Sequence, residues 1–366
     1  MSEAVADPDH LLRTRGATHR LDGFVVGCAF SRDGSVAAFA TGEGTVALTK
    51  VADPAWTEIV AHDGAILSLC ADVAGSGFLT GGDDNTLRRV AADGAVSVID
   101  KGRRWVEHVA SFAGKQGLIA SAAGKQVVLR DANDATIKTL EHDSTVSGLA
   151  FDAKGKRLAV SHYGGASLWF TGAKSETARR LAWKGSHIGV ALHPDGEALV
   201  TAMQENELHG WRLSDGHNMR MSGYPQKTQS FAFSRNGRWL ATGGAEAVVL
   251  WPFFGGGPMG KAPTELAGVP DAVAVRVAFH PQHDIVAAGF SDGTVLMSDV
   301  GTRRVLPVCG PGKQQGRGPG LGPGLGPGLG PAGGAVSALA FNPDGTRLAF
   351  GTQDGTVALI DLSTRP

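Results

Sequence analysis

The chain has 366 residues, of which 42% are hydrophobic and 19% charged, and its formal net charge is -1. This length exceeds one ordinary globular domain, so either two domains or one repeat architecture is expected. Because the net charge is close to zero, we expect neither a nucleic-acid nor a membrane partner. No stretch approaches the about 20 apolar residues of a membrane span, and residues 1–16 lack a secretory pattern, so we expect a cytoplasmic protein.

One pattern recurs along the chain: an alternating strand, a turn, a second strand, a tight turn and a third strand. Its apolar period of two indicates strands and not helices. The clearest instance is residues 335–362, where Pro343, Asp344 and Gly345 form the first turn. Proline presets φ, aspartate can bond its own backbone, and glycine supplies a positive φ. The repeats begin at Val25, Ile66, Val106, Val146, Gly189, Gln229, Val275 and Ala335.

The spacing of these repeats predicts the fold. Most are separated by about forty residues, the period of a four-stranded propeller blade. Eight repeats, each followed by a variable fourth segment, predict one all-β domain over residues 1–366, a closed propeller of eight four-stranded blades. The position that Phe30 fills in repeat 1 recurs at Ala71, Ser111, Phe151, Leu192, Phe233, Phe279 and Phe341.

Residues 310–334 interrupt this spacing between repeats 7 and 8. They form a Gly-Pro-Leu tract of low complexity, which cannot bury a core. The repeat resumes in phase at Ala335, so we expect a loop insert, and whether it has a function of its own stays open.

The last repeat ends after its third strand, at Leu362. A ring left open there would expose unpaired strand edges, which promote aggregation. About twenty residues precede repeat 1, and we expect a segment within residues 11–20 to pair as the fourth strand of the last blade.

These repeats resemble the WD-repeat (WD40) family of β-propellers. The family unit has a His before the first strand, an Asp in the turn between the second and third strands, and a closing Trp-Asp. The resemblance implies a closed propeller, for which seven blades is the commoner number and therefore the alternative here. It also implies that the His, a Ser or Thr, the Asp and the Trp form a hydrogen-bonded chain within a blade. The positions that match the His and the turn Asp, and so have an expected structural role, are His62, Asp84, His142, Asp292 and Asp354.

Three repeats depart from this pattern at the position of the turn Asp. Gly124, Tyr163 and Ala245 stand there. We therefore expect these repeats to lack the polar network and to depend on apolar packing.

No motif for catalysis or for a cofactor is found. The chain has no GxSxG, HExxH or phosphate-binding loop, and its three cysteines show no metal-ligand spacing. We expect neither an enzyme nor a cofactor nor a metal site, and the high Ala and Gly content favours a bacterial source.

Members of the family generally bind proteins or peptides on the rim of one face. Large polar and aromatic residues concentrate at the rim positions of repeats 2 to 6, with Trp105 as the expected anchor. The alternative for Trp105 is a side chain packed between blades. A rival function is a small-ligand or metal site at the channel mouth, formed by Asp83, Glu107, His108 and His162. The candidate rim residues are Phe24, Asp83, Trp105, Glu107, His162, Gln204, Lys227 and Gln229.

Overall fold

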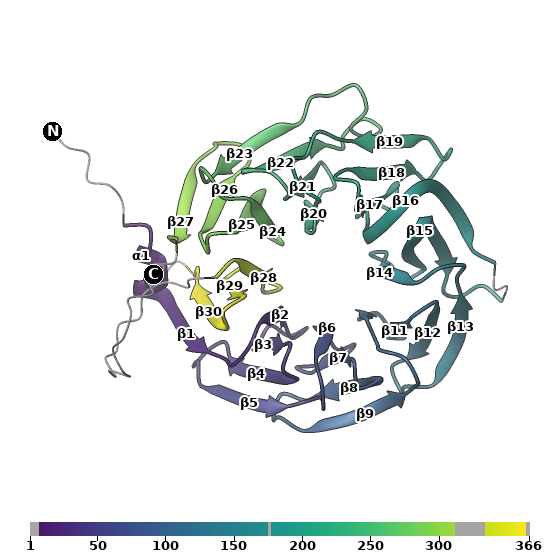
Figure 1. Cartoon of the computed structure of the whole chain (residues 1–366), viewed down its shortest axis with the longest axis horizontal. Coiled ribbons are helices and arrows are strands. Elements are labelled where there is room, and N and C mark those ends of the chain that lie inside the picture. Colours follow the sequence, from purple (N-terminus) through teal and green to yellow (C-terminus); the bar gives the residue numbers. More distant parts are fainter. Residues whose placement is uncertain (1–6, 175–176, 312–333, 364–366) are drawn as a thin grey trace, which may run out of the picture.

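The computed structural model describes residues 7–174, 177–311 and 334–363. These form thirty strands and one short helix, arranged as a ring of sheets around a central axis (Figure 1). In each sheet the strands are antiparallel, and the first strand of each repeat faces the centre of the ring. Among the described residues, no helix is both long and apolar enough to cross a membrane.

Hydrogen bonds join the described strands into seven sheets, six of four strands and one of six. The first three sheets contain β2 (Val25–Phe30), β3 (Val36–Thr41), β4 (Thr45–Lys50) and β5 (Trp56–Val60); β6 (Ile66–Ala71), β7 (Phe78–Gly82), β8 (Thr86–Val90) and β9 (Val96–Lys101); and β10 (His108–Phe112), β11 (Leu118–Ala123), β12 (Gln126–Asp131) and β13 (Thr136–Glu141).

The six-stranded sheet follows, and then three more sheets of four. The six strands are β14 (Val146–Phe151), β15 (Arg157–Phe170), β16 (Arg179–Leu192), β17 (Ala198–Met203), β18 (Leu208–Arg212) and β19 (Asn218–Met221). The remaining strands are β20 (Phe231–Phe233), β21 (Trp239–Thr242), β22 (Ala247–Pro252) and β23 (Thr264–Gly268); β24 (Ala274–Phe279), β25 (Ile285–Phe290), β26 (Val295–Asp299) and β27 (Val305–Cys309); and β28 (Val336–Phe341), β29 (Arg347–Thr352), β30 (Thr356–Asp361) and β1 (Gly16–Arg20).

The six-stranded sheet holds both repeat 4 and repeat 5, so the eight repeats occupy seven sheets. The prediction of eight separate four-stranded blades is not met, and the number of sheets is that of the seven-blade alternative. The reason lies in β15 and β16, each 14 residues long. β15 pairs with β14 up to His162 and with β16 from Tyr163 onward, and β16 continues into pairing with β17 from His187.

The ends of β15 nevertheless lie side by side, because Thr171 N donates to Lys156 O at 3.0 Å. The equivalent bond in repeat 1 runs from Val51 N to Ser35 O at 2.9 Å. β15 therefore folds back on itself as the second and third strands of repeat 4. The turn lies at Gly164 and Gly165, which both have a positive φ. β16 runs from repeat 4 into repeat 5, so no break separates the two repeats.

The N-terminal strand closes the ring, as predicted. β1 pairs antiparallel with β30, from Gly16 opposite Ile360 to Arg20 opposite Thr356. Residues 11–15 do not join this strand but belong to helix α1 (His10–Arg15), which packs Leu11 and Leu12 against the last two sheets. Both ends of the described chain therefore meet at one sheet (Figure 1). The predicted insert lies almost wholly outside the described residues.

The core lies between neighbouring sheets and consists mainly of small aliphatic side chains with single phenylalanines. Phe39, Phe78, Phe290 and Phe350 are fully buried. One cluster joins the first and last sheets, with Val25 and Phe39 packed against Val357. Every sheet is covered on both faces by its neighbours. The connections between strands are therefore the exposed parts of the ring, where side chains can vary without disturbing the core.

Candidate docking face

Antiparallel pairing brings two kinds of connection to one end of the ring. Ile66, which begins β6, pairs with Gly82 at the end of β7, and Thr86, which begins β8, pairs with Lys101 at the end of β9. The segments that lead into each inner strand therefore share an end with the turns between second and third strands. We call this end the entry face and the opposite end the exit face.

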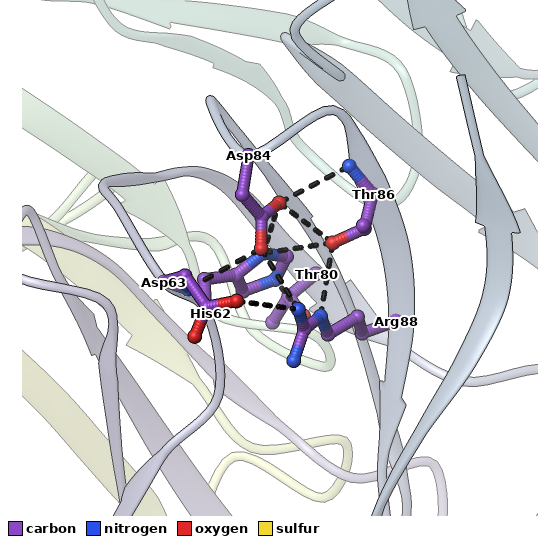
Figure 2. A network of polar contacts seen from close by, with 6 residues as sticks. All are labelled: His62, Asp63, Thr80, Asp84, Thr86 and Arg88. Atoms are coloured by element: carbon purple, nitrogen blue, oxygen red, sulfur yellow. Dashed lines mark hydrogen bonds and ion pairs between the residues drawn. The ribbon is translucent and has the colours of Figure 1, made fainter. Parts of the chain in front are cut away.

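A polar network on the entry face holds the second sheet together (Figure 2). His62 Nδ1 lies 2.9 Å from Asp84 Oδ1, and His62 Nε2 lies 2.8 Å from Thr80 Oγ1. Asp84 also accepts hydrogen bonds from Thr86 Oγ1 at 2.6 Å and Arg88 Nη2 at 2.9 Å. These bonds join the segment before β6 to the turn between β7 and β8.

The same network sets the ionisation of its members. Burial lowers the pKa of His62, and this outweighs the hydrogen bond to Asp84. For Asp84, burial acts to raise the pKa, but the hydrogen bonds from Thr86 and His62 outweigh burial and hold it well below its usual value. The pair therefore consists of a neutral imidazole and a carboxylate at neutral pH.

His142 has different partners. Trp169 Nε1 donates to His142 Nε2 at 3.0 Å, and His142 Nδ1 lies 3.2 Å from Lys125 O. A buried indole N–H requires an acceptor, and the imidazole supplies one. The expectation that the repeat with Tyr163 in its turn lacks a polar network is therefore wrong.

A tyrosine fills the His position in repeat 6. Tyr224 Oη accepts a hydrogen bond from Trp251 Nε1 at 2.6 Å and lies 2.6 Å from Thr242 Oγ1. This repeat has Ala245 in its turn, so the expected loss of the network is wrong here as well. The phenol of Tyr224 accepts a hydrogen bond from the indole as an imidazole does in repeat 4. A search of the sequence for His and Asp alone does not reveal this bond.

The other two turn aspartates cap their own turns. Asp292 accepts hydrogen bonds from Thr294 N at 3.0 Å and Thr294 Oγ1 at 2.9 Å. Asp354 accepts from Thr352 Oγ1 at 2.5 Å and from Arg20 Nη1 at 3.1 Å. The second bond ties the closing strand to the last repeat.

Trp105 lies on the entry face, in the segment that leads into β10. Gly102 N donates to Asn85 O at 2.9 Å, and Val106 N donates to Gly82 O at 3.0 Å, so both ends of the segment are held. Val106 is buried, whereas the Trp105 side chain is 57% exposed. The alternative of a Trp105 packed between blades is therefore wrong.

Two glycines make this close approach possible. A Cβ at Gly81 would overlap the carbonyl and side chain of Val106, and a Cβ at Gly82 would overlap the ring of His62. Gly81 thus lets the 102–106 segment lie directly on the end of β7, and Gly82 leaves room for the ring of His62. Trp105 is thereby presented on a backbone that is already fixed.

The other candidate rim residues lie on the same face but differ in exposure. Phe24 is 41% exposed, and Gln204 and Gln229 are also exposed. Asp83 and Glu107 are half-buried, and Glu107 Oε2 accepts a hydrogen bond from Gly124 N at 3.2 Å. These residues therefore surround the channel mouth and do not converge on one point.

Two further candidates are engaged in local hydrogen bonds. His162 Nε2 lies 2.9 Å from Ser167 Oγ, and Lys227 Nζ donates to Gln204 Oε1 at 3.5 Å.

Tyr163 was missed as a rim residue, although it is 68% exposed. Its place in the turn beside His162 was the available signal, and the sequence analysis considered it only as a replacement for aspartate.

The rival function divides into a metal site and a small-ligand site. In the part of the chain that the structure describes, no group of three or more His, Cys, Asp or Glu side chains converges. His108 lines a cavity of about 350 Å³ in the channel with Ser68, Gln229 and Ser230. Burial lowers the pKa of His108 to about 4, so its ring is neutral at pH 7.

Comparison with known proteins gives matches to two WD-repeat family models. Residues 277–365 match the family described as anaphase-promoting complex subunit 4 WD40 domain, and residues 55–88 match the WD domain, G-beta repeat. The second match covers His62 and Asp84, and the ring of four-stranded units agrees with both. Over these two segments the chain carries WD repeats, and its ring of sheets has the architecture of a β-propeller. WD-repeat propellers generally bind protein partners and are generally non-catalytic.

Two similar proteins extend the comparison. Telomerase protein component 1 of Mus musculus is 24% identical over 281 residues, which cover 72% of this chain and 10% of that protein. The WD-repeat chain thus spans about a tenth of the length of this relative. The crystal structure of the computationally designed Ika8 protein superposes with a TM-score of 0.70 at 16% identity, covering 93% of this chain and 98% of that one. This likeness shows the fold alone.

Proposed function

We propose that this propeller is a non-catalytic, cytoplasmic scaffold that binds a protein or peptide partner on its entry face, with Trp105 as the anchor. The observation that carries the proposal is an exposed tryptophan on a segment held by backbone hydrogen bonds at both ends. Tryptophan is enriched among residues that dominate binding energy. A fixed backbone also reduces the ordering entropy lost on binding.

The composition of the entry face supports this role. Phe24 and Tyr163 add exposed aromatic surface on the same face, and Gln204 and Gln229 add exposed polar groups. An apolar anchor surrounded by polar groups is the usual composition of a protein interface. The mouse relative is by its name a component of telomerase, which agrees with a role in an assembly.

Affinity capture with the full chain tests the proposal. Trp105→Ala should weaken partner capture at least about thirtyfold, since a hot-spot aromatic contributes about 2 kcal/mol or more. Its melting temperature should stay near that of the parent, because the side chain is exposed. Phe170→Ala is the matched control, since Phe170 is 48% exposed at the end of β15 on the exit face. Equal loss of capture in both variants, or in neither, would contradict the proposal.

A small polar ligand in the channel is the second candidate, favoured by the cavity beside His108. Because this ring is neutral at pH 7, it would bind a hydrogen-bonding ligand and not an anion. Equilibrium dialysis of the purified chain against small-molecule mixtures, with His108→Ala as the comparison, tests this candidate. Retention of one compound by the parent and not by the variant would support it.

A further inference from the structure

We propose that the partner segment bound beside Trp105 is acidic, and that Arg103 and Arg104 bind its carboxylates. This inference rests on the proposed function and names the chemistry of the partner. The segment Gly102–Trp105 is exposed along its whole length, so both guanidinium groups are accessible on the entry face. They stand directly next to the exposed indole in the sequence, on a backbone that is fixed at Gly102 and Val106.

The two arginines are unusual because the chain does not neutralise them. Among the described arginines, only Arg103, Arg104 and Arg304 have side chains without a hydrogen bond, an ion pair or a ring contact. Arg304 lies in the turn between β26 and β27, on the exit face. Arg103 and Arg104 are therefore the two uncompensated guanidinium groups of the described entry face.

Two carboxylates of the adjoining connections have other partners. Asp84 binds His62 and Arg88, and Glu107 accepts its bond from Gly124 N. Arg104 extends over the neighbouring turn, where a Cβ at Gly124 would lie 3.1 Å from its Cδ and Nη1. Its side chain thus lies over the turn between β11 and β12 and is not paired with an acid of this chain.

The geometry favours carboxylates as ligands. A guanidinium group presents a planar fork of donors that matches a carboxylate in a bidentate fashion. Two such groups beside one indole fit a short segment that alternates acidic and apolar side chains. Because the three groups are consecutive in the chain, a segment of a few residues can reach all of them.

The rest of the entry face distinguishes a short acidic peptide from a nucleic acid. Its other connections carry exposed carboxylates, and the whole chain has a net charge of -1. An extended polyanion would meet these carboxylates beyond the 102–105 segment and the neighbouring Lys125, whereas a short acidic segment would not. The exposed acidic residues of these connections are Asp22, Glu43, Asp63, Asp143, Glu205, Glu246 and Asp271.

Selection from a random 12-residue peptide library displayed on phage tests the inference. The full chain, the double variant Arg103→Glu/Arg104→Glu and the control Arg304→Glu are each used as bait. We expect the parent and the control to enrich peptides that contain Asp or Glu beside an apolar residue, and the double variant to lose this enrichment. A selected acidic peptide should bind Arg103→Ala/Arg104→Ala at least tenfold more weakly than the parent. Melting temperatures should be equal, since these side chains are exposed.

Other outcomes separate this inference from the proposed function. Enrichment of non-acidic peptides that requires Trp105 would overturn the inference and leave the docking face standing. Acidic enrichment that persists in the double variant would overturn it as well. Binding of a fluorescein-labelled single-stranded oligonucleotide that depends on Arg103 and Arg104, in place of peptide binding, would assign the site to nucleic acid instead. If no bait enriches any peptide and affinity capture also fails, the docking face itself is wrong.

Discussion

Asp84 Oδ1 lies 2.9 Å from His62 Nδ1, and this contact joins the segment before β6 to the turn after β7. His62 is buried, so loss of either partner leaves a buried polar group unpaired. We expect Asp84→Ala or His62→Ala to lower the free energy of unfolding by about 2–4 kcal/mol, measured by denaturant titration. Asp63→Ala is the control, because that carboxylate is exposed and 3.7 Å from Arg88, and it should change stability by less than about 0.5 kcal/mol.

Buried histidines predict how stability depends on pH. Burial lowers the pKa of His62, His142, His187 and His209, and it lowers that of His108 to about 4. In the unfolded chain the histidines have a pKa near their ordinary value of 6.5, so as the pH falls the unfolded chain takes up protons before the folded chain does. The free energy of unfolding should have its full value above about pH 6.5. It should fall as the pH drops below that, by up to about 1.4 kcal/mol per pH unit for each such residue.

Unfolding titrations at several pH values between 7 and 4 check this prediction. His108→Gln should flatten part of the decline, since glutamine does not titrate. A stability that rises as the pH falls from 6.5 to 4 would contradict the assigned direction. The lowered pKa of Asp84 adds a further loss only below its ordinary value of 3.8.

Closure by β1 predicts the effect of a truncation. Deleting residues 1–22 removes the strand that pairs with β30 and exposes the edge of that strand. We expect a lower melting temperature and self-association, seen as a larger mass by light scattering during gel filtration. Deletion of residues 1–6 alone is the control and should leave a monodisperse species like the parent. A truncated chain that matches the parent in both measurements would mean that closure does not depend on β1.

The tract between repeats 7 and 8 stays a prediction, because residues 312–333 lie outside the described residues. Excision of residues 313–331 should leave the fold intact and alter the unfolding free energy by about 1 kcal/mol or less, since loop-closure entropy varies slowly with length. Circular dichroism and denaturant titration measure this. A loss of several kcal/mol would show that the tract packs against the propeller.

Strand pattern and turn chemistry predicted the repeats and the closing strand, because both depend on local alternation and on spacing along the chain. The merging of repeats 4 and 5 could not be predicted in this way. It depends on whether β16 continues as one strand from its pairing with β15 into its pairing with β17 at His187, which is a matter of a few torsion angles. Sequence spacing is the same whether or not the strand continues.

Part of the candidate site could be predicted from the sequence, and part could not. Counting within the repeat placed Trp105 on the entry face, but its exposure depends on how the 102–106 segment packs on Gly81 and Gly82. The hydrogen bond between Trp251 and Tyr224 was missed, because the family pattern contains His at the position of Tyr224. Any side chain of similar length with a polar end can accept this bond. The free arginines next to Trp105 were missed because pairing is visible only when all neighbours are placed.

Amide hydrogen exchange with and without a captured partner tests the docking face most directly. The account predicts slower exchange on binding at residues 102–107 and at the turn around Tyr163, with no change at the exit-face residues that follow β15. The Trp105→Ala chain, mixed with the same partner, should show no such protection. Protection confined to the exit face, or equal protection in Trp105→Ala, would contradict the assignment of the entry face as the docking surface.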